Sequence, residues 1–283
     1  MLSIHTNYTS LLTQNNLNKT SGAMDTAMQR ISTGLRINSA ADDAAGLQIA
    51  TRLQSQTNGL NVAQRNSQDA ISMLQTAEGA FDEMTNIAHR MKDLATQAAN
   101  GTNSADEHAA MQAEWDELEA ELNSIVDNTQ YGSGNNLLGA GGILDAAVSF
   151  QIGATTAEKL DLDVSAELQG VRASITALNG EDLATDADSA MDAIDALLNG
   201  DGTNAGVGEV RSALGANINR LEHTVVNLGN MAENTEMAKG RIMDTDYAVE
   251  SSNMMKNQML TQMSMSMLSQ ANGMSGMVMS LVG

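Results

Sequence analysis

The chain has 283 residues and a formal net charge of −21 at pH 7, and it contains no proline and no cysteine. The lack of cysteine excludes a disulfide framework and thiol chemistry, and the lack of proline leaves long helices uninterrupted. So acidic a chain repels nucleic acid phosphates, which argues against DNA or RNA binding. The charge is uneven, because residues 101–200 contain 19 acids and two bases, whereas residues 251–283 carry only Lys256.

A first helix is expected over residues 3–36, since apolar side chains recur there at helical spacing. These side chains are Leu17, Met24, Met28, Ile31 and Leu35. The segment 1–16 has no basic region followed by an apolar stretch, so we expect no cleaved secretory signal. The residues Asn38–Asp43 interrupt the pattern and supply side chains that start helices.

A long helix is expected over residues 43–99, where apolar side chains repeat every seven residues in two adjacent rows. One row contains Ile49, Ala63, Ala70, Ala77, Met84, Met91 and Ala98, and the other contains Leu53, Leu60, Leu74, Phe81, Ala88 and Ala95. Only Gln56 and Ser67 break the rows. Such a helix is roughly 85 Å long at about 1.5 Å per residue. It must therefore lie against other long helices, in the same chain or in other copies.

The next 65 residues predict a shorter helix, a glycine-rich loop and a β-hairpin. Ser104 opens the helix, with Asp106 and Glu107 in its first turn, where the helix dipole favours acids. Alternating apolar residues over 148–152 and 160–164 predict two strands joined by a turn.

Residues 165–187 are acidic and weakly patterned, and a short helix is expected over 188–198. A second long helix is expected over about 208–242, followed by a methionine-rich terminal helix. The two ends of the chain carry similar helical patterns and little charge. We therefore expect the N- and C-terminal helices to pair with each other.

Several long segments resemble bacterial flagellin. They are SLLTQNNLNKTSGAM (10–24), RISTGLRINSAADDAAGLQIA (30–50), NGLNVAQRNSQDAISMLQTAEGAF (58–81), RIMDTDYAVESSNM (241–254) and MLSQAN (267–272). The resemblance covers roughly residues 1–135 and 208–283. Two places depart from the family pattern: the glycine-rich residues 199–206, and a C-terminal segment in which methionine replaces aliphatic residues.

The resemblance implies a mainly α fold, with a long antiparallel coiled-coil helical rod, a β-hairpin, and paired N- and C-terminal helices. It assigns residues 1–42 plus 243–283 to a filament-core domain, and residues 43–164 plus 208–242 to a rod domain with the hairpin near 146–164. Residues 165–207 would be a short acidic connection in place of outer domains. The implied core-packing residues are Leu17, Met24, Met28, Ile31, Leu35, Leu260 and Leu268.

The resemblance also implies a surface that contacts the next subunit and that a flagellin-sensing Toll-like receptor of animal hosts grips. Its residues here would be Arg90, Leu94, Gln97 and Glu114. Leu94 lies outside the two apolar rows and is flanked by charged residues, so we expect its side chain to be exposed.

The sequence gives little support for a metal site or a catalytic site. The nine methionines between Met254 and Met279 offer thioethers that hold Cu(I), but methionine more often fills helix interfaces. The aspartates between Asp182 and Asp195 lack the order of a calcium loop, and the four histidines lack metal-ligand spacing. We find no nucleophile–base set, so we expect no enzyme activity, no cofactor and no metal.

The function implied is a self-assembling subunit of the extracellular flagellar filament, exported by the flagellar type III system. Implied partners are identical subunits, an export chaperone, hook-associated junction and cap proteins, and possible host receptors. Two alternatives remain open: a hook–filament junction protein, and a translocator-like protein whose uncharged tail enters host membrane. Residues 257–283 are too rich in polar side chains for spontaneous insertion, so we expect none.

Overall fold

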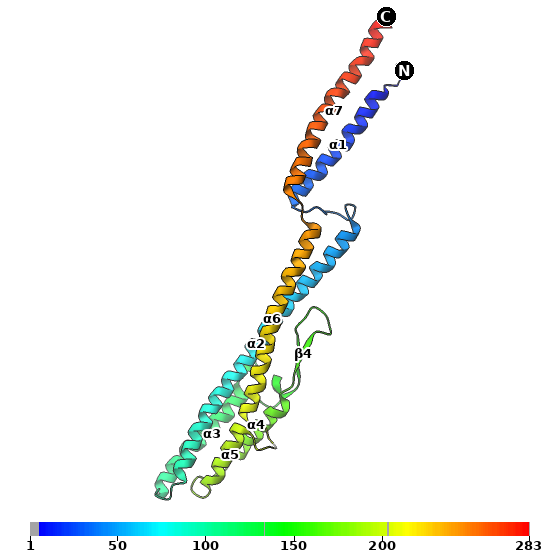
Figure 1. Ribbon diagram of the computed structural model, residues 1–283. Helices are drawn as coiled ribbons and strands as arrows, with labels where there is room; N and C mark the ends of the chain where they lie inside the picture. Colours follow the sequence, from blue (N-terminus) through cyan, green and yellow to red (C-terminus); the bar gives the residue numbers. More distant parts are fainter. Residues whose placement is uncertain (1–5, 133, 203, 283) are drawn as a thin grey trace. The chain divides into compact units, whose positions relative to one another are not determined.

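The computed structural model describes residues 6–132, 134–202 and 204–282 (Figure 1). Its α-helices are α1 (Tyr8–Thr33), α2 (Ala44–Ala98), α3 (Ala105–Asn128), α4 (Ser165–Leu178), α5 (Ala187–Asn199), α6 (Val207–Met243) and α7 (Tyr247–Val282). A 3₁₀ turn, η1, spans Ile143–Asp145, and the strands are β1 (Gln130–Tyr131), β2 (Asn135–Asn136), β3 (Val148–Gln151) and β4 (Lys159–Leu162). The expected mainly α fold with a β-hairpin is confirmed.

The density of internal contacts divides the chain into two compact units. The terminal unit consists of Met1–Thr57 and Glu233–Gly283, and the central unit is Asn58–Ala232. The expected domain boundaries lie near residues 42 and 243, between helices. The division into two compact units falls inside α2 and α6, so each of these helices contributes residues to both units.

The loop before α2 is held by two aspartates. The carboxylate of Asp43 accepts a hydrogen bond from the backbone N–H of Gly46 at 2.8 Å, which caps the start of α2. The carboxylate of Asp42 accepts backbone N–H groups of Ser39 at 2.8 Å and Asn38 at 3.1 Å. These donors, Ser39 first, hold the pKa of Asp42 below its usual value. The loop residues therefore start the long helix as expected.

The predicted apolar rows on α2 are buried in the central unit. Their buried members there are Leu60, Ala63, Ala70, Leu74, Ala77, Phe81, Met84, Ala88, Met91, Ala95 and Ala98. The break at Ser67 is also buried, and its hydroxyl donates to the carbonyl of Ala63 at 2.9 Å. In the terminal unit the pattern fails at Ile49, whose side chain is exposed.

Helix α6 runs antiparallel to α2 within the central unit. Arg211, near the start of α6, pairs with Asp82 at 3.0 Å. Leu228, later in α6, clusters with Leu60 and Ala63, which lie earlier in α2. Residues early in α6 therefore contact residues late in α2, and residues late in α6 contact residues early in α2, as in an antiparallel coiled coil.

Helix α3 and the hairpin form as the sequence predicts. Ser104 caps α3 in a capping box with Glu107, and the Ser104 backbone N–H lowers the pKa of that glutamate. Trp115 of α3 is fully buried in the core of the central unit. Strands β3 and β4 pair antiparallel, with Val148 opposite Leu162.

Residues 165–187 are not weakly structured, which corrects the sequence expectation. Helix α4 occupies 165–178, and α5 follows after a short turn. Their buried side chains are Leu168, Val171, Ile175, Leu178, Ala190, Ile194 and Leu197, and all join the main core. Spacings of three and four place each set on one helix face, so this acidic segment is amphipathic.

The expected exposure of Leu94 is wrong. Its side chain is only 2% exposed and belongs to the same core as Leu74 and Phe81. The physical reason is that this face of α2 meets α3: Arg90, one helical turn before Leu94, pairs with Glu114 of α3, and Met111 and Trp115 of α3 belong to the same core as Leu94. The sequence predicted α3 as a helix but not which face of α2 it covers, because Leu94 lies outside the two apolar rows.

We predict that Leu94→Ala destabilises the central unit as much as Leu74→Ala does. Each removes a buried leucine side chain, which costs about 2–5 kcal/mol of unfolding free energy. Val226→Ala on the exposed face of α6 is the control, with an effect within about 0.5 kcal/mol. Denaturant unfolding measures all three, and a Leu94→Ala value near that of Val226→Ala would contradict the buried assignment.

Candidate interaction surfaces

Helices α1 and α7 pair antiparallel in the terminal unit, as expected for the two ends of the chain (Figure 1). The amide of Asn7 donates to the carbonyl of Ala271 at 2.8 Å, and the hydroxyl of Ser10 donates to Asn272 at 2.9 Å. Farther along the pair, Arg30 lies 3.8 Å from Glu250. The early residues of α1 therefore meet the late residues of α7.

The side chains between α1 and α7 are mostly small or polar. On α1 the positions that are not exposed include a series at spacings of three and four: Ser10, Thr13, Leu17, Thr20, Met24, Ala27 and Ile31. On α7 the corresponding series is Glu250, Met254, Asn257, Thr261, Ser264, Leu268 and Ala271. Of the apolar members of these two series, Ala27 and Ala271 are buried and the others are half-buried. Little apolar surface is removed from water, so this contact stabilises the pair weakly.

Many of the large apolar side chains of both helices are exposed rather than buried in that contact. Of the 17 large apolar side chains that are exposed among the described residues, four lie on α1 and nine on α7. They are Tyr8, Leu11, Leu12 and Met28 on α1, and Tyr247, Val249, Met255, Met259, Leu260, Met263, Met265, Met267 and Met274 on α7. An exposed apolar surface of this density marks a site of protein association.

The residues expected to pack a filament core fall into two groups. Leu17, Met24, Ile31 and Leu268 lie half-buried in the α1–α7 contact. Leu35 is also half-buried, in the connection after α1, where it forms a β-bridge with Asp244. The other two, Met28 of α1 and Leu260 of α7, are exposed.

Sequence reasoning missed most of the exposed surface. Tyr8, Leu11 and Leu12 were not singled out, and the α7 methionines were read mainly as packing. The available signal was the four-residue spacing of Met255, Met259, Met263 and Met267, which differs from the alternating spacing of the buried positions.

A second surface lies on α2 and α3 of the central unit. The Arg90 guanidinium donates to the Glu114 carboxylate at 2.7 Å through Nε, and a second nitrogen lies 2.6 Å from the same oxygen. Gln97, seven residues after Arg90, is exposed on the same face of α2, and Asp93, three residues after Arg90, is exposed beside them. The structure therefore brings Arg90, Gln97 and Glu114 onto one polar surface, whereas Leu94 lies beneath it.

Two further polar features lie among the described residues, a small groove and the start of α5. A groove of about 320 Å³ contains Lys92 and Arg211, but each is already paired with an aspartate. Asp186, read as part of an acidic run, caps α5 by accepting from the backbone N–H of Ser189. The described part of the chain shows no cluster of three metal-binding side chains. His5 lies outside the described residues.

None of the described helices is long and apolar enough to cross a membrane. The longest uncharged stretch, in α7, alternates methionine with serine, glutamine and asparagine.

Comparisons with known proteins agree with these features. A family model of the bacterial flagellin N-terminal helical region matches residues 4–141, and a model of the C-terminal helical region matches residues 191–282. Flagellin of Halalkalibacterium halodurans is 44% identical over 252 residues, 87% of each chain. Flagellin A of Vibrio anguillarum is 33% identical over 380 aligned positions that cover 99% of each chain. The crystal structure of Bacillus cereus flagellin aligns with a TM-score of 0.48 and 28% identity, over 58% of this chain and 88% of that one.

The two family models together span most of the chain, and the relatives match it nearly from end to end. The paired helices α1 and α7 lie at the two ends of the chain, and the helical central unit between them contains the hairpin. The chain therefore belongs to the bacterial flagellin family and is a structural subunit of the extracellular flagellar filament, a homopolymer exported by the type III system that serves motility.

Proposed function

We propose that α1 and α7 are the part of the subunit that packs inside the filament. The observation that carries this proposal is their exposed apolar surface, which the small and polar α1–α7 contact cannot bury. Equivalent helices of neighbouring copies would cover it. The gain in buried apolar surface, at about 25 cal/mol per Å², would then be realised only between subunits.

The proposed domain assignment follows from the packing of α1 and α7 inside the filament. Residues 1–42 plus 243–283 would form the filament core, and residues 43–164 plus 208–242 the rod. Residues 165–207 stand where longer relatives carry outer domains, and here they fold as α4 and α5 onto the rod. In support, the alignment with Vibrio anguillarum flagellin A exceeds the length of this chain by 97 positions, so that relative carries extra residues.

We assign the polar surface of Arg90, Gln97 and Glu114 to a lateral contact with an adjacent subunit. The Arg90–Glu114 pair holds two helices in a fixed geometry while both side chains stay accessible. Host flagellin-sensing receptors would grip the same surface on free subunits. The export chaperone, the junction proteins and the cap would bind the exposed faces of α1 and α7.

Deletion of residues 254–283 should abolish polymerisation, because it removes most of the exposed apolar side chains of α7. Melting of the central unit should not change, since its core residues lie between Leu60 and Leu228. Sedimentation of polymer and thermal melting measure the two effects. A point substitution on the exposed face of α6, Val226→Gln, is the control that should leave both unchanged. Normal filaments from the truncated chain would refute the core assignment.

Hydrogen exchange should separate the two units. Backbone amides of α1 and of α7 up to residue 274 should exchange rapidly in isolated subunits, because their contact buries little apolar surface. The same amides should become protected in filaments. Amides of α2 from Leu60 to Ala98 serve as the control and should be slow in both states. Strong protection of α1 and α7 in the isolated subunit would contradict this account.

Arg90→Ala and Glu114→Ala should weaken filament assembly more than they affect folding. An exposed ion pair contributes less than about 1 kcal/mol to stability, so melting should change little. The critical concentration for polymerisation should rise, and the signal of a host-receptor reporter should fall. Lys92→Ala is the matched control, since it removes a comparably exposed ion pair with Asp195 on another face of α2. Equal assembly defects in Lys92→Ala and Arg90→Ala would argue against a specific contact.

A further inference from the structure

The methionines of α7 differ in environment from the methionines of the central unit. Met255, Met259, Met263 and Met267, called here the methionine face, are between 54% and 62% exposed. In the central unit, Met73, Met84, Met91 and Met111 are buried. One chain therefore carries two sets of thioethers that differ chiefly in their access to solvent.

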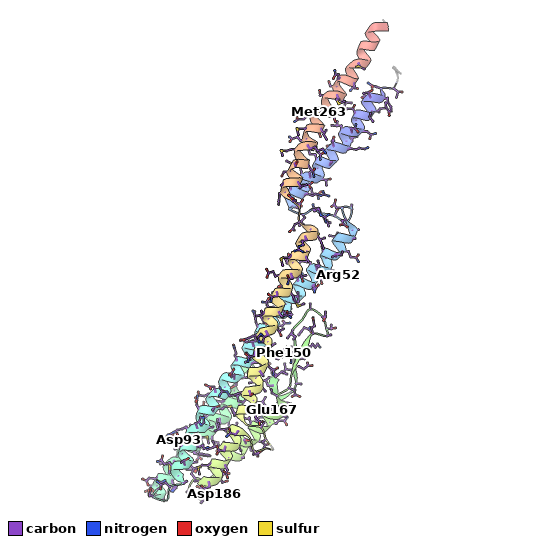
Figure 2. The ribbon with its side chains drawn as sticks, viewed as in Figure 1. Arg52, Asp93, Phe150, Glu167, Asp186 and Met263 are labelled. Atoms are coloured by element: carbon purple, nitrogen blue, oxygen red, sulfur yellow. The ribbon has the colours of Figure 1, made fainter. Side chains whose placement is uncertain are left out.

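The methionine face is distinct from the surface that α7 presents to α1. Its members follow at intervals of four, which rotates each by roughly 40° from the last, so all four lie on one broad side of the helix. Positions that face α1 carry Thr261 and Ser264 instead. Met263 lies on the stretch of α7 that runs beside α1 (Figure 2). No side chain of this chain covers the methionine face in the described structure, as its exposure shows.

Exposed thioethers are chemically reactive toward peroxides. A sulfur lone pair attacks one oxygen of hydrogen peroxide, the O–O bond breaks, and the departing hydroxide takes up the proton of the transferred hydroxyl. Sulfur loses two electrons and the peroxide is reduced, so thioether and hydrogen peroxide become sulfoxide and water. The product is polar, and methionine sulfoxide reductases reverse the reaction. Access of the oxidant to sulfur controls which methionines react.

We propose that the methionine face of α7 is an oxidative modification site of the unassembled subunit, and that its oxidation to sulfoxide excludes the subunit from the filament. The inference rests on the proposed burial of α7 between subunits. Burying a sulfoxide without a hydrogen-bond partner is unfavourable, whereas burying a thioether is favourable. Each subunit carries four such methionines, so each further sulfoxide weakens assembly more.

The lack of charge around these methionines strengthens the effect. Between residues 251 and 283 the only charged side chain is Lys256. Four sulfoxides would therefore change the polarity of a surface that otherwise consists of thioethers and small uncharged groups. Reduction of the sulfoxides would return the subunit to the pool that assembles.

The first test treats full-length subunits with hydrogen peroxide and maps sulfoxides by peptide mass spectrometry. The methionine face should oxidise faster than Met84 and Met91, and the critical concentration should rise by at least about tenfold. Methionine sulfoxide reductases should restore assembly. Oxidation of the methionine face no faster than that of Met84 and Met91 would overturn the inference.

A second measurement needs no variant. Partly oxidised wild-type subunits are allowed to polymerise, and sulfoxide occupancy is compared between pellet and supernatant. Sulfoxides of the methionine face should be depleted from the pellet. Equal occupancy, with normal filament formation, would overturn the inference and leave the proposed packing of α7 standing. If assembled filaments oxidise at the methionine face as fast as subunits do, the packing proposal itself fails, and the inference with it.

Variants then assign the effect to the methionine face. In M255L/M259L/M263L/M267L, peroxide should no longer change the critical concentration measured for that variant before treatment. The control is M237L on α6, which removes a methionine that is 49% exposed but lies outside the methionine face. It should remain as peroxide-sensitive as wild type. Retained sensitivity in the quadruple variant, or lost sensitivity in M237L, would overturn the assignment.

Discussion

The weak contact between α1 and α7 is the constraint on which the terminal unit depends. Threonine, serine, asparagine and alanine occupy much of the shared surface, while leucine, tyrosine and methionine side chains face outward. A helix pair in water gains most of its stability from buried apolar area. The α1–α7 contact alone therefore leaves much of this apolar area in water, and under the packing proposed above neighbouring subunits would bury it.

The central unit is built in the opposite way. Its core is one cluster that runs through α2, α3, α4, α5, α6 and the hairpin, with Phe81 and Trp115 fully buried. In this region α2 meets three other helices: α3 through Arg90, α5 through Lys92, and α6 through Asp82. Most of the buried apolar side chains of the described residues therefore lie in the central unit, whereas many of the exposed ones lie on α1 and α7.

The charged side chains are also distributed unequally between the central unit and the ends of the chain. Acids predominate from residue 101 to 200, on elements of the central unit, and α7 is nearly uncharged. Like charges repel where subunits should not approach, and an uncharged helix can be buried without desolvating ions. The single ion pair between α1 and α7 in the described residues, Arg30 with Glu250, lies near the connection to the rest of the unit, away from the methionine face. Polarity changes on that face, such as oxidation, therefore act on association with little competition from existing charges.

Repeats and caps in the sequence were sufficient to predict α2, α3, α6, the hairpin and the pairing of the chain ends. These features depend on local spacing: heptads on α2, Ser104 with Glu107 at the start of α3, and alternation over 148–152. The sequence also placed Leu17, Met24, Ile31 and Leu268 on helix faces with few charges.

Tertiary structure alone decided what each face meets. Leu94 is buried on the side of α2 that meets α3, where Arg90 pairs with Glu114 and Trp115 joins the same core. Residues 165–178 join that core as helix α4, which the sequence did not predict. The α7 methionines are exposed because α1 packs against Thr261, Ser264 and their neighbours instead. Spacing along one helix states which residues share a face, but the partner of that face is set by contacts distant in sequence, and a local pattern does not contain them.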